Sequence, residues 1–327
     1  MQISRRDLLK ILLPFAALIV WACEQPPRLG VYTPVQDLPF ADAKLGECVR
    51  EFAAAAGVVT AGRLLELRCN NPAGNGISDL TGLEHLANLK SLDLAHNQIS
   101  AFGPVTGLEH LEDLDLGHNR ITSVPSEGTH VPLKRLNLDY NAIESLDWLE
   151  SYFSLENLSV AHNRIADLQP LRFTPAMQEL NLSHNRIESI DAVRGLRQLR
   201  WLNVSGNSVR DLSALAESTG LVALFAAENT FTDITALSGM DQLSELDLNG
   251  NPLADAGPLR SLTNLRRLDL RGTGLLDLTP LADLGNLQEL QLTATGIDCE
   301  SVATLRGELG AEVLVLSAPC EAGSGNE

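Results

Sequence analysis

The chain has few aromatic residues and few basic ones. Aromatic residues make up 4% of its 327 residues and hydrophobic residues 44%, so its core must be built mainly from aliphatic side chains. Against 42 Asp and Glu there are only 24 Lys and Arg, a formal net charge of −18. This balance argues against nucleic acid as a partner, because phosphate binding needs basic side chains. The five cysteines are too few for a disulfide scaffold and show no metal-ligand spacing.

The N-terminal apolar run, Ile11–Ala22, is too short to cross a hydrocarbon core of about 30 Å as a helix. A basic start before such a run is the layout of a secretory signal. Here Arg5 and Arg6 resemble the twin-arginine export signal of bacteria, and the segment that ends at Cys23 resembles the box at which bacterial lipoproteins are cleaved and acylated. We expect export and a lipid on Cys23; an uncleaved anchor is the alternative.

An 11-residue pattern, L-x-x-L-x-L-x-x-N-x-L, recurs every 22 residues along most of the chain. Partial copies are expected before and after it, the first using Leu65, Leu67 and Asn70 and the last using Leu314 and Leu316. Self-similarity at a fixed period of this length indicates stacked structural repeats. The ten full copies begin at Leu89, Leu111, Leu133, Leu155, Met177, Leu199, Leu221, Leu243, Leu265 and Leu287.

This pattern resembles the leucine-rich repeats of bacterial internalins. The resemblance covers about residues 40–320 and implies an α/β leucine-rich-repeat solenoid of about 11–12 repeats. A curved parallel sheet would form its concave face, and short helical, 3-10 or irregular segments its convex face. The expected division is a signal peptide at 1–22, a Pro-rich spacer at 23–39, an N-terminal helical cap at 40–61, repeats at 62–298, a C-terminal cap at 299–320 and a disordered tail at 321–327.

An asparagine column is expected where the chain turns away from each strand. There its amide can satisfy backbone groups of adjacent turns that burial would leave unpaired. Thr273 and Thr295 replace it in the last two full repeats, so we expect that end to be looser. The column comprises Asn70, Asn97, Asn119, Asn141, Asn163, Asn185, Asn207, Asn229 and Asn251.

Four cysteines remain beside the acylation candidate. In a solenoid Cys69 and Cys299 lie about ten repeats apart, roughly 50 Å at ~4.8 Å per parallel strand. A disulfide needs Cα atoms within roughly 7 Å. We therefore expect one disulfide in each cap, Cys48–Cys69 and Cys299–Cys320. Free buried thiols are the alternative, because twin-arginine cargo folds before it reaches an oxidising compartment.

No catalytic motif accompanies the repeats, so we expect neither an enzyme nor a cofactor. Histidine pairs are good zinc or copper ligands, and a column of them precedes the asparagines. Histidine also tolerates the turn geometry at this position, and we favour that structural role over a metal site or a metal enzyme. The column comprises His96, His118, Tyr140, His162 and His184.

Acidic side chains occupy strand positions near both ends of the sheet. Paired carboxylates can act as acid and base or hold calcium. On an open, solvated sheet nothing should desolvate them, so we expect no perturbed pKa. These residues are Glu66, Asp93, Asp115, Asp247 and Asp269.

Strand residues that do not point inward line the concave face, which repeat proteins use for binding. Trp201 and Phe225 are two large aromatics on adjacent strands of this face. Aromatic anchors within a polar rim are typical of a protein-binding hot spot. They could instead stack on sugar rings, or pack on each other and cover Ala223. The polar rim comprises Asn181, Asn203, Glu245 and Asp247.

The sequence thus predicts an exported, lipid-anchored, non-catalytic leucine-rich repeat protein of the bacterial cell envelope, facing the periplasm or the exterior. We expect a monomer that binds a protein partner on its concave face. The alternative is a carbohydrate or cell-wall binding module that uses the exposed aromatics. Since the chain is acidic, it should contact the membrane only through its lipid.

Overall fold

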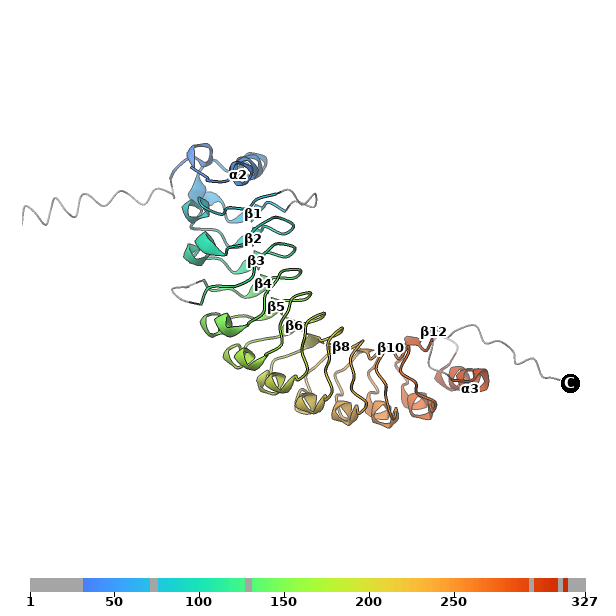
Figure 1. Cartoon of the computed structure of the whole chain (residues 1–327). Helices are drawn as coiled ribbons and strands as arrows, with labels where there is room; N and C mark the ends of the chain where they lie inside the picture. The colour runs from blue at the N-terminus through green and yellow to red at the C-terminus, as the bar shows by residue number, and fades with distance from the viewer. Residues whose placement is uncertain (1–31, 71–75, 127–130, 294–296, 311–313, 317–327) are drawn as a thin grey trace, which may run out of the picture.

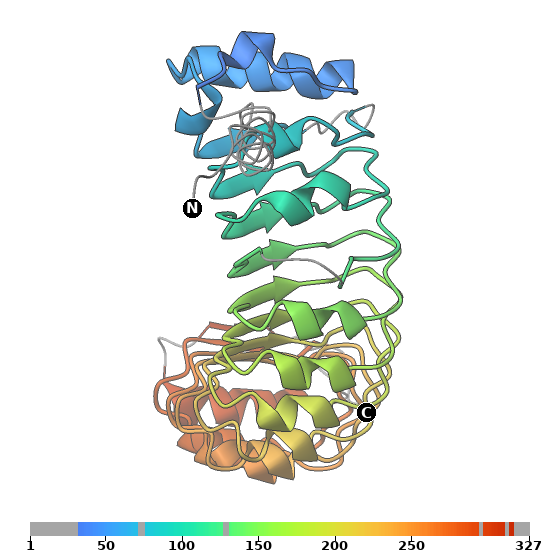
Figure 2. The same cartoon turned by 90° about the vertical axis from the view of Figure 1, so that its left-hand side faces the viewer.

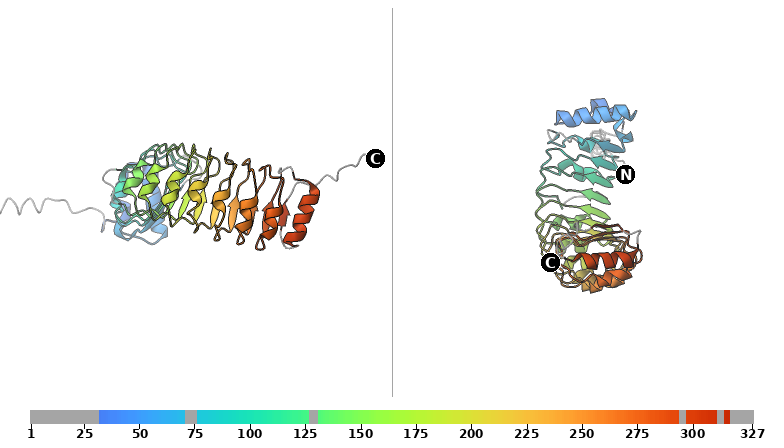
Figure 3. Two further views of the ribbon diagram at one scale, coloured as in Figure 1. Left: turned by 90° about the horizontal axis from the view of Figure 1, so that it is seen from below. Right: turned by 90° about the vertical axis from the view of Figure 1, so that its right-hand side faces the viewer.

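The computed structural model describes residues 32–70, 76–126, 131–293, 297–310 and 314–316. They form a curved solenoid whose inner face is one parallel sheet and whose outer face carries short 3-10 helices (Figure 1). The strands stack in a single file (Figure 2), and the 3-10 helices follow one another along the convex side (Figure 3). The predicted fold class, a leucine-rich-repeat solenoid, is confirmed.

The 12 strands of the sheet follow each other in sequence order. They are β1 (Glu66–Arg68), β2 (Ser91–Asp93), β3 (Asp113–Asp115), β4 (Arg135–Asn137), β5 (Asn157–Ser159), β6 (Glu179–Asn181), β7 (Trp201–Asn203), β8 (Ala223–Phe225), β9 (Glu245–Asp247), β10 (Arg267–Asp269), β11 (Glu289–Gln291) and β12 (Leu314–Leu316). The 3-10 helices of the described residues are η1 (Val35–Asp37), η2 (Ala61–Arg63), η3 (Leu83–His85), η4 (Gly103–Gly107), η5 (Asp147–Ser151), η6 (Gln169–Phe173), η7 (Asp191–Gly195), η8 (Ser213–Leu215), η9 (Thr235–Leu237), η10 (Gly257–Ser261) and η11 (Thr279–Asp283).

Each strand is three residues long, and from β1 to β11 the middle residue is buried in the core. From β2 to β11 the middle residues are leucines, and each of those from β2 to β10 pairs with the leucine 22 residues further on, as Leu92 does with Leu114. Both are at most 2% exposed. Because successive strand residues point to opposite sides, the first and third residues of every strand face the concave surface. The constant period therefore aligns the concave side chains in two rows.

The first and last strands have a different register from the one expected. Leu67 pairs with Leu92, so Leu65 lies outside the core and is 46% exposed. The expected first copy was therefore shifted by two residues, and Asn70 is not part of the asparagine ladder. Its side chain instead donates to Asp93 at 2.8 Å. At the other end Val315, and neither Leu314 nor Leu316, pairs with Leu290.

Helix α2 (Ala43–Ala55) covers the N-terminal end of the solenoid (Figure 1). Its buried residues include Leu45 and Val49. Asp42 caps it by accepting from two of its backbone N–H groups, and also accepts from the N–H groups of Ser78 and Asp79 in the first turn of the solenoid. Burial alone would raise the pKa of Asp42, but these four donors outweigh it and the pKa is lowered. One carboxylate thus ties the cap to the repeats.

The expected Cys48–Cys69 disulfide is present and joins α2 to the chain just after β1, with Cα atoms 5.9 Å apart. Helix α3 (Cys299–Leu309) covers the other end, capped by Asp298 and packed through Val302 and Leu305. Both Cys320 and Cys23 lie outside the described residues, so the second disulfide and the acylation site stay predictions. None of the helices in the described part of the chain is long and apolar enough to cross a membrane.

The asparagine ladder binds each turn to the one before it. Asn163 donates to the carbonyls of Leu138, Val160 and Ala161 at 2.9–3.1 Å, and its Oδ1 accepts from the N–H of Ile143 at 2.9 Å. Two of these partners belong to the preceding repeat. The same four contacts recur at Asn97, Asn119, Asn141, Asn185, Asn207 and Asn229.

The ladder weakens toward the C-terminal end. Asn251 keeps its three donor contacts, but its buried Oδ1 makes no hydrogen bond within the described residues. In the next repeat the hydroxyl of Thr273 donates only to the carbonyl of Leu270, at 2.7 Å. The repeats that contain Asn251 and Thr273 therefore make fewer side-chain hydrogen bonds to the preceding repeat than the repeats from Asn97 to Asn229 do.

Candidate functional site

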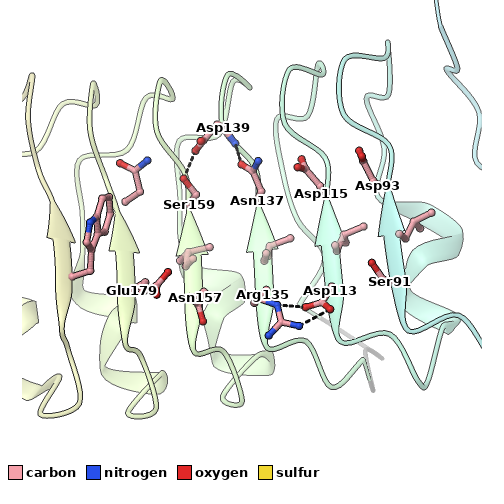
Figure 4. Close-up of a pocket in the computed structure, with 16 residues that line it drawn as sticks. Ser91, Asp93, Asp113, Asp115, Arg135, Asn137, Asp139, Asn157, Ser159 and Glu179 are labelled. Carbon is pink, nitrogen blue, oxygen red and sulfur yellow. Dashed lines mark hydrogen bonds and ion pairs between the residues drawn. The ribbon is translucent and has the colours of Figure 1, made fainter. Parts of the chain in front are cut away.

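The concave face contains a hollow of about 640 Å³ that reaches from β2 to β7 (Figure 4). Its floor is the sheet itself, and Trp201 stands at one end of it. The side chains of the two concave rows project into it from consecutive strands. The polar residues that line it are Ser91, Asp93, Asp113, Asp115, Arg135, Asn137, Asp139, Asn157, Ser159, Glu179 and Asn181.

The hollow is acidic. Five carboxylates and one guanidinium line it. That guanidinium, of Arg135, pairs with Asp113 on the neighbouring strand, with Nη2 donating to Oδ2 at 2.6 Å, and the pairing raises the pKa of Arg135. Asp113 is thereby neutralised. The charges of Asp93, Asp115 and Asp139 are not matched by any ion pair found among the described side chains.

The expectation of unperturbed carboxylates was wrong at two positions. Burial raises the pKa of Asp115, and the like charges of Asp93 and Asp139 raise it further, against the lowering effect of its hydrogen bonds with Gly117 and Asn137. Burial likewise raises the pKa of Asp247 near the other end of the sheet. Side chains of adjacent strands stand only about 4.8 Å apart, so each row partly buries its own members. A sheet face that is open to solvent can therefore still desolvate a carboxylate.

The third residue of most strands stabilises the turn that follows. Asp93 and Asp115 each accept from the backbone N–H two residues on, at 3.0 and 2.9 Å. An amide does the same at Asn137, Asn181 and Asn203. The turn thus needs an oxygen acceptor at this position, whether or not it is charged.

At β5 and β8 the third residue does not accept from that N–H, and a neighbouring repeat supplies the acceptor. Ser159 ends β5 and leaves the N–H of Ala161 to Asp139, whose Oδ1 accepts from that N–H and from the Ser159 hydroxyl, both at 2.6 Å (Figure 4). Phe225 ends β8, and the N–H of Ala227 donates to the hydroxyl of Ser205 at 3.2 Å. Neither Asp139 nor Ser205 was predicted from the sequence to be such an acceptor. Two features of the sequence could have indicated them. Each lies two positions after the end of a strand, and the next strand ends in a residue, Ser159 or Phe225, that does not accept from the turn.

The predicted aromatic anchors touch each other. Trp201 and Phe225 lie on adjacent strands with ring centroids 5.5 Å apart and planes tilted by 44°. Both are half-buried, and Ala223 beside them is buried, 6% exposed. The packing alternative is therefore realised in part, while each ring keeps an exposed surface. Trp201 borders the hollow, whereas Phe225 lies beyond it.

The structure divides the predicted rim between two places. Asn181 lines the hollow with Trp201. Asn203, Glu245 and Asp247 follow along the face outside it. Glu245 accepts from Arg267 at 3.1 Å, and Asp247 accepts from the N–H two residues on at 3.0 Å. This second group is therefore engaged in contacts within the sheet.

The histidine column forms a continuous stack of rings beside the sheet. Successive rings from His96 through Tyr140 to His184 have centroids 4.0–4.1 Å apart and lie nearly parallel. All five residues have φ between 53° and 58°, the left-handed region that histidine tolerates. Because the rings are stacked, the ring nitrogens of successive residues lie in separate planes and do not point toward a common centre. In the described part of the chain, no three metal-ligating side chains come close enough to hold a metal ion. The stack fits a structural role.

Comparison with known proteins agrees with this geometry. Family models described as leucine-rich repeat match residues 153–209, 241–283, and 85–103 with 107–124. No curated protein matches the chain. An internalin of Listeria monocytogenes is similar over 88% of this chain and 92% of its own, with 24% identity and a TM-score of 0.69.

Two further solved structures are similar. Internalin C2 of the same bacterium matches 71% of this chain and 94% of its own, at 28% identity and a TM-score of 0.53. The ectodomain of a plant receptor kinase from Arabidopsis thaliana, solved in complex with Casparian strip integrity factor 2, matches 72% of this chain and 33% of its own, at 22% identity and a TM-score of 0.54. The repeat matches show that these segments are leucine-rich repeats, and the 12-stranded solenoid and its structural likenesses show that the chain has the leucine-rich-repeat fold.

Proposed function

We propose that this protein is a non-catalytic binding protein of the bacterial cell envelope and that its concave face holds a protein partner. The hollow bounded by Trp201 is the observation that carries the proposal. It joins a broad polar floor to an aromatic side chain that is held in place by Phe225. Partly buried aromatics inside a polar surface are the usual anchors of protein interfaces.

The arrangement favours a protein over a glycan. Sugar rings stack best on a flat aromatic surface, and the two rings here are tilted by 44°. The polar side chains of the hollow present both donors and acceptors along six strands, which suits an extended surface. The receptor ectodomain named above, solved with its ligand, shares the fold. Carbohydrate binding is the second outcome of the test below.

The proposed location rests on the N-terminal segment. Its Arg5 and Arg6 and its Cys23 resemble an export signal and an acylation site. Cell fractionation of the full chain and of Cys23→Ser addresses this part: the variant, which lacks the acyl acceptor, should leave the membrane fraction. A variant that stays with the membranes would argue for an uncleaved anchor.

The test of partner binding is crosslinked capture from cell envelopes with the solenoid and its Trp201→Ala/Phe225→Ala variant, followed by affinity measurement with the purified partner. The double variant should lose about 2 kcal/mol or more of binding, close to thirtyfold in Kd. Phe153→Ala is the matched control, because Phe153 is 70% exposed and lies outside the sheet. Equal binding by all three proteins would contradict the proposed anchors. Retention of glycan without protein would favour the carbohydrate alternative.

A further inference from the structure

The carboxylates of the hollow carry a charge that the fold does not use. Asp93 and Asp115 serve as acceptors for the turns after β2 and β3. Neutral asparagines do this equally in the repeats that follow, as at Asn181 and Asn203. Asp139 accepts two hydrogen bonds that an asparagine Oδ1 could also accept. The folding role of these side chains therefore explains their oxygens but not their negative charge.

Asp93, Asp115 and Asp139 gather negative charge at one end of the hollow, and these surroundings raise the free energy of the charged form of Asp115. They stand on consecutive repeats and face one hollow (Figure 4). The charges that raise the pKa of Asp115 are those of Asp93 and Asp139, which are also negative. Its own position is partly buried, so solvent screens the repulsion less than on a free surface. A cation placed between them would gain three attractions.

The far wall of the hollow is suited to the same kind of ligand. Glu179 lies directly opposite Trp201 on the adjacent strand. A guanidinium that rests on an indole ring gains a cation–π contact, and a carboxylate next to the ring can accept its N–H donors. The two ends of the hollow thus offer separate positions for positive side chains, with the polar Asn157 and Asn181 between them.

From this charge complementarity we infer that the hollow receives an extended basic segment of a partner polypeptide, whose arginine or lysine side chains contact Asp93, Asp115 and Asp139 at one end and Trp201 with Glu179 at the other. The inference rests on the proposed function, because it names the chemistry of the partner that the concave face would hold. It also places the contact over β2–β7, whereas the sequence pointed to β6–β9.

The probes are fluorescent decapeptides of alternating alanine and either arginine, lysine, glutamine or glutamate, titrated at physiological salt. Arginine peptides should bind best and lysine peptides next, because only the guanidinium both forks between carboxylates and stacks on indole. Glutamine and glutamate peptides should not bind. Absence of binding by both basic peptides, or equal binding by the glutamine peptide, would overturn the inference.

Two triple variants separate a specific site from the net charge of −18. D93N/D115N/D139N removes three charges from the hollow and keeps the turn acceptors, and its arginine-peptide affinity should fall about tenfold or more. D247N/D269N/E289Q removes three charges from the other end of the same face, and its affinity should fall less than about threefold. Equal losses would show that the peptides follow net charge alone and would overturn the inference.

The partner captured from envelopes then distinguishes the two proposals. If it binds the hollow triple variant as tightly as the wild type, the basic-segment inference fails while the proposed function stands. If no partner is captured at all, the proposed function fails, and the peptide titration still decides whether the hollow recognises basic chains. Loss of the partner in the hollow triple variant alone supports both.

Discussion

The two ends of the concave face both carry carboxylates, but they neutralise them differently. At the C-terminal end Asp269 accepts from Nε of Arg271 at 2.9 Å, and Arg267 pairs with Glu245. At the N-terminal end Asp115 has hydrogen-bond donors around it but no cation. The same repeat thus forms an equally regular sheet with paired or unpaired charge. Charge on this face is therefore free to differ between repeats without loss of the fold.

The ladder shows the opposite asymmetry. Asn163 makes four hydrogen bonds, two of them to the preceding repeat, whereas Thr273 makes one through its side chain. The N-terminal end combines uncompensated charge with strong cohesion between repeats. At the C-terminal end, arginines pair with Glu245 and Asp269 but, among the described ion pairs, not with Asp247, and cohesion is weaker. The repeats that would receive a ligand are thus the ones most firmly joined.

The largest effect is expected from a break in the ladder. Asn163→Ala removes four hydrogen bonds and leaves the buried N–H of Ile143 without an acceptor, while the three carbonyls keep other donors. The free energy of unfolding should fall by about 3 kcal/mol. Urea denaturation gives the total, and hydrogen exchange at the Ile143 N–H shows whether the loss is local. A loss below about 1 kcal/mol would mean that water replaces the amide at little cost.

The corresponding substitution in the C-terminal repeats should raise the free energy of unfolding. In Thr273→Asn the new Oδ1 can accept from the N–H of Leu253, which now donates to the backbone carbonyl of Thr273 at 3.1 Å. The gain should be about 1 kcal/mol. If Thr273→Asn destabilises the protein, the C-terminal repeats differ from the others in backbone geometry and not only in side-chain bonding.

A smaller effect separates the two kinds of carboxylate. The folded pKa of Asp115 lies above the ordinary value of 3.8, so its contribution to stability is present below that value and is lost as pH rises through the folded pKa. Asp115→Asn should therefore stabilise the protein at pH 7, by less than about 1 kcal/mol, and have no such effect at pH 3. Asp269→Asn should instead destabilise it at pH 7, because it leaves Arg271 unpaired. Thermal unfolding of both variants at the two pH values makes the comparison, and a shared sign would contradict it.

The smallest effect concerns the ring stack. Burial lowers the pKa of His118, and the neighbouring His96 lowers it further, against the raising effect of Asp139 and Asp115. Burial lowers the pKa of His162. The adjacent His184 and, beyond Tyr140, His118 lower it further, against the raising effect of Asp139. A lowered folded pKa means that stability is present above the unfolded value near 6.5 and is lost as pH falls toward the folded pKa.

The variant H118Y/H162Y should flatten this dependence between pH 7.5 and pH 5, because Tyr140 already fits the same column at φ 53°. Urea midpoints across that range supply the measurement. His110→Tyr is the control, since His110 is exposed and lies outside the column. If the control flattens the curve as much, the stack does not sense pH.

The sequence predicts the architecture well because a 22-residue period determines register once the sheet is parallel. The inward column from Leu92 to Leu290 follows directly from it. The prediction failed where the period fails: the spacing before β2 is 25 residues, so Leu67 and not Leu65 takes the inward place. The sequence pattern also does not show contacts between side chains of neighbouring strands. Burial raises the pKa of Asp115, and carboxylates one repeat away on either side raise it further.

The site residues were predicted in part for the same reason. Trp201 could be assigned to the concave face from its strand position alone, but its contact with Phe225 and its place at the end of a hollow depend on side-chain directions. The hollow itself lies mostly over β2–β6, where the sequence shows only small and charged residues. Such residues attract little notice in a search for aromatic anchors.

Asp139 accepts a hydrogen bond from the Ala161 N–H of the next repeat, and this contact limits how the chain can gain or lose repeats by unequal recombination. Loss of the 22-residue unit that carries Asp139 would place Gly117 in its column, and glycine has no side chain to receive the Ala161 N–H. Loss of the unit that carries Ser205 would bring Ser183 into position, whose hydroxyl can still accept from Ala227. The repeats are thus not equally exchangeable: the fourth and fifth strands must be inherited together, while the seventh can be lost or duplicated without leaving an orphaned amide.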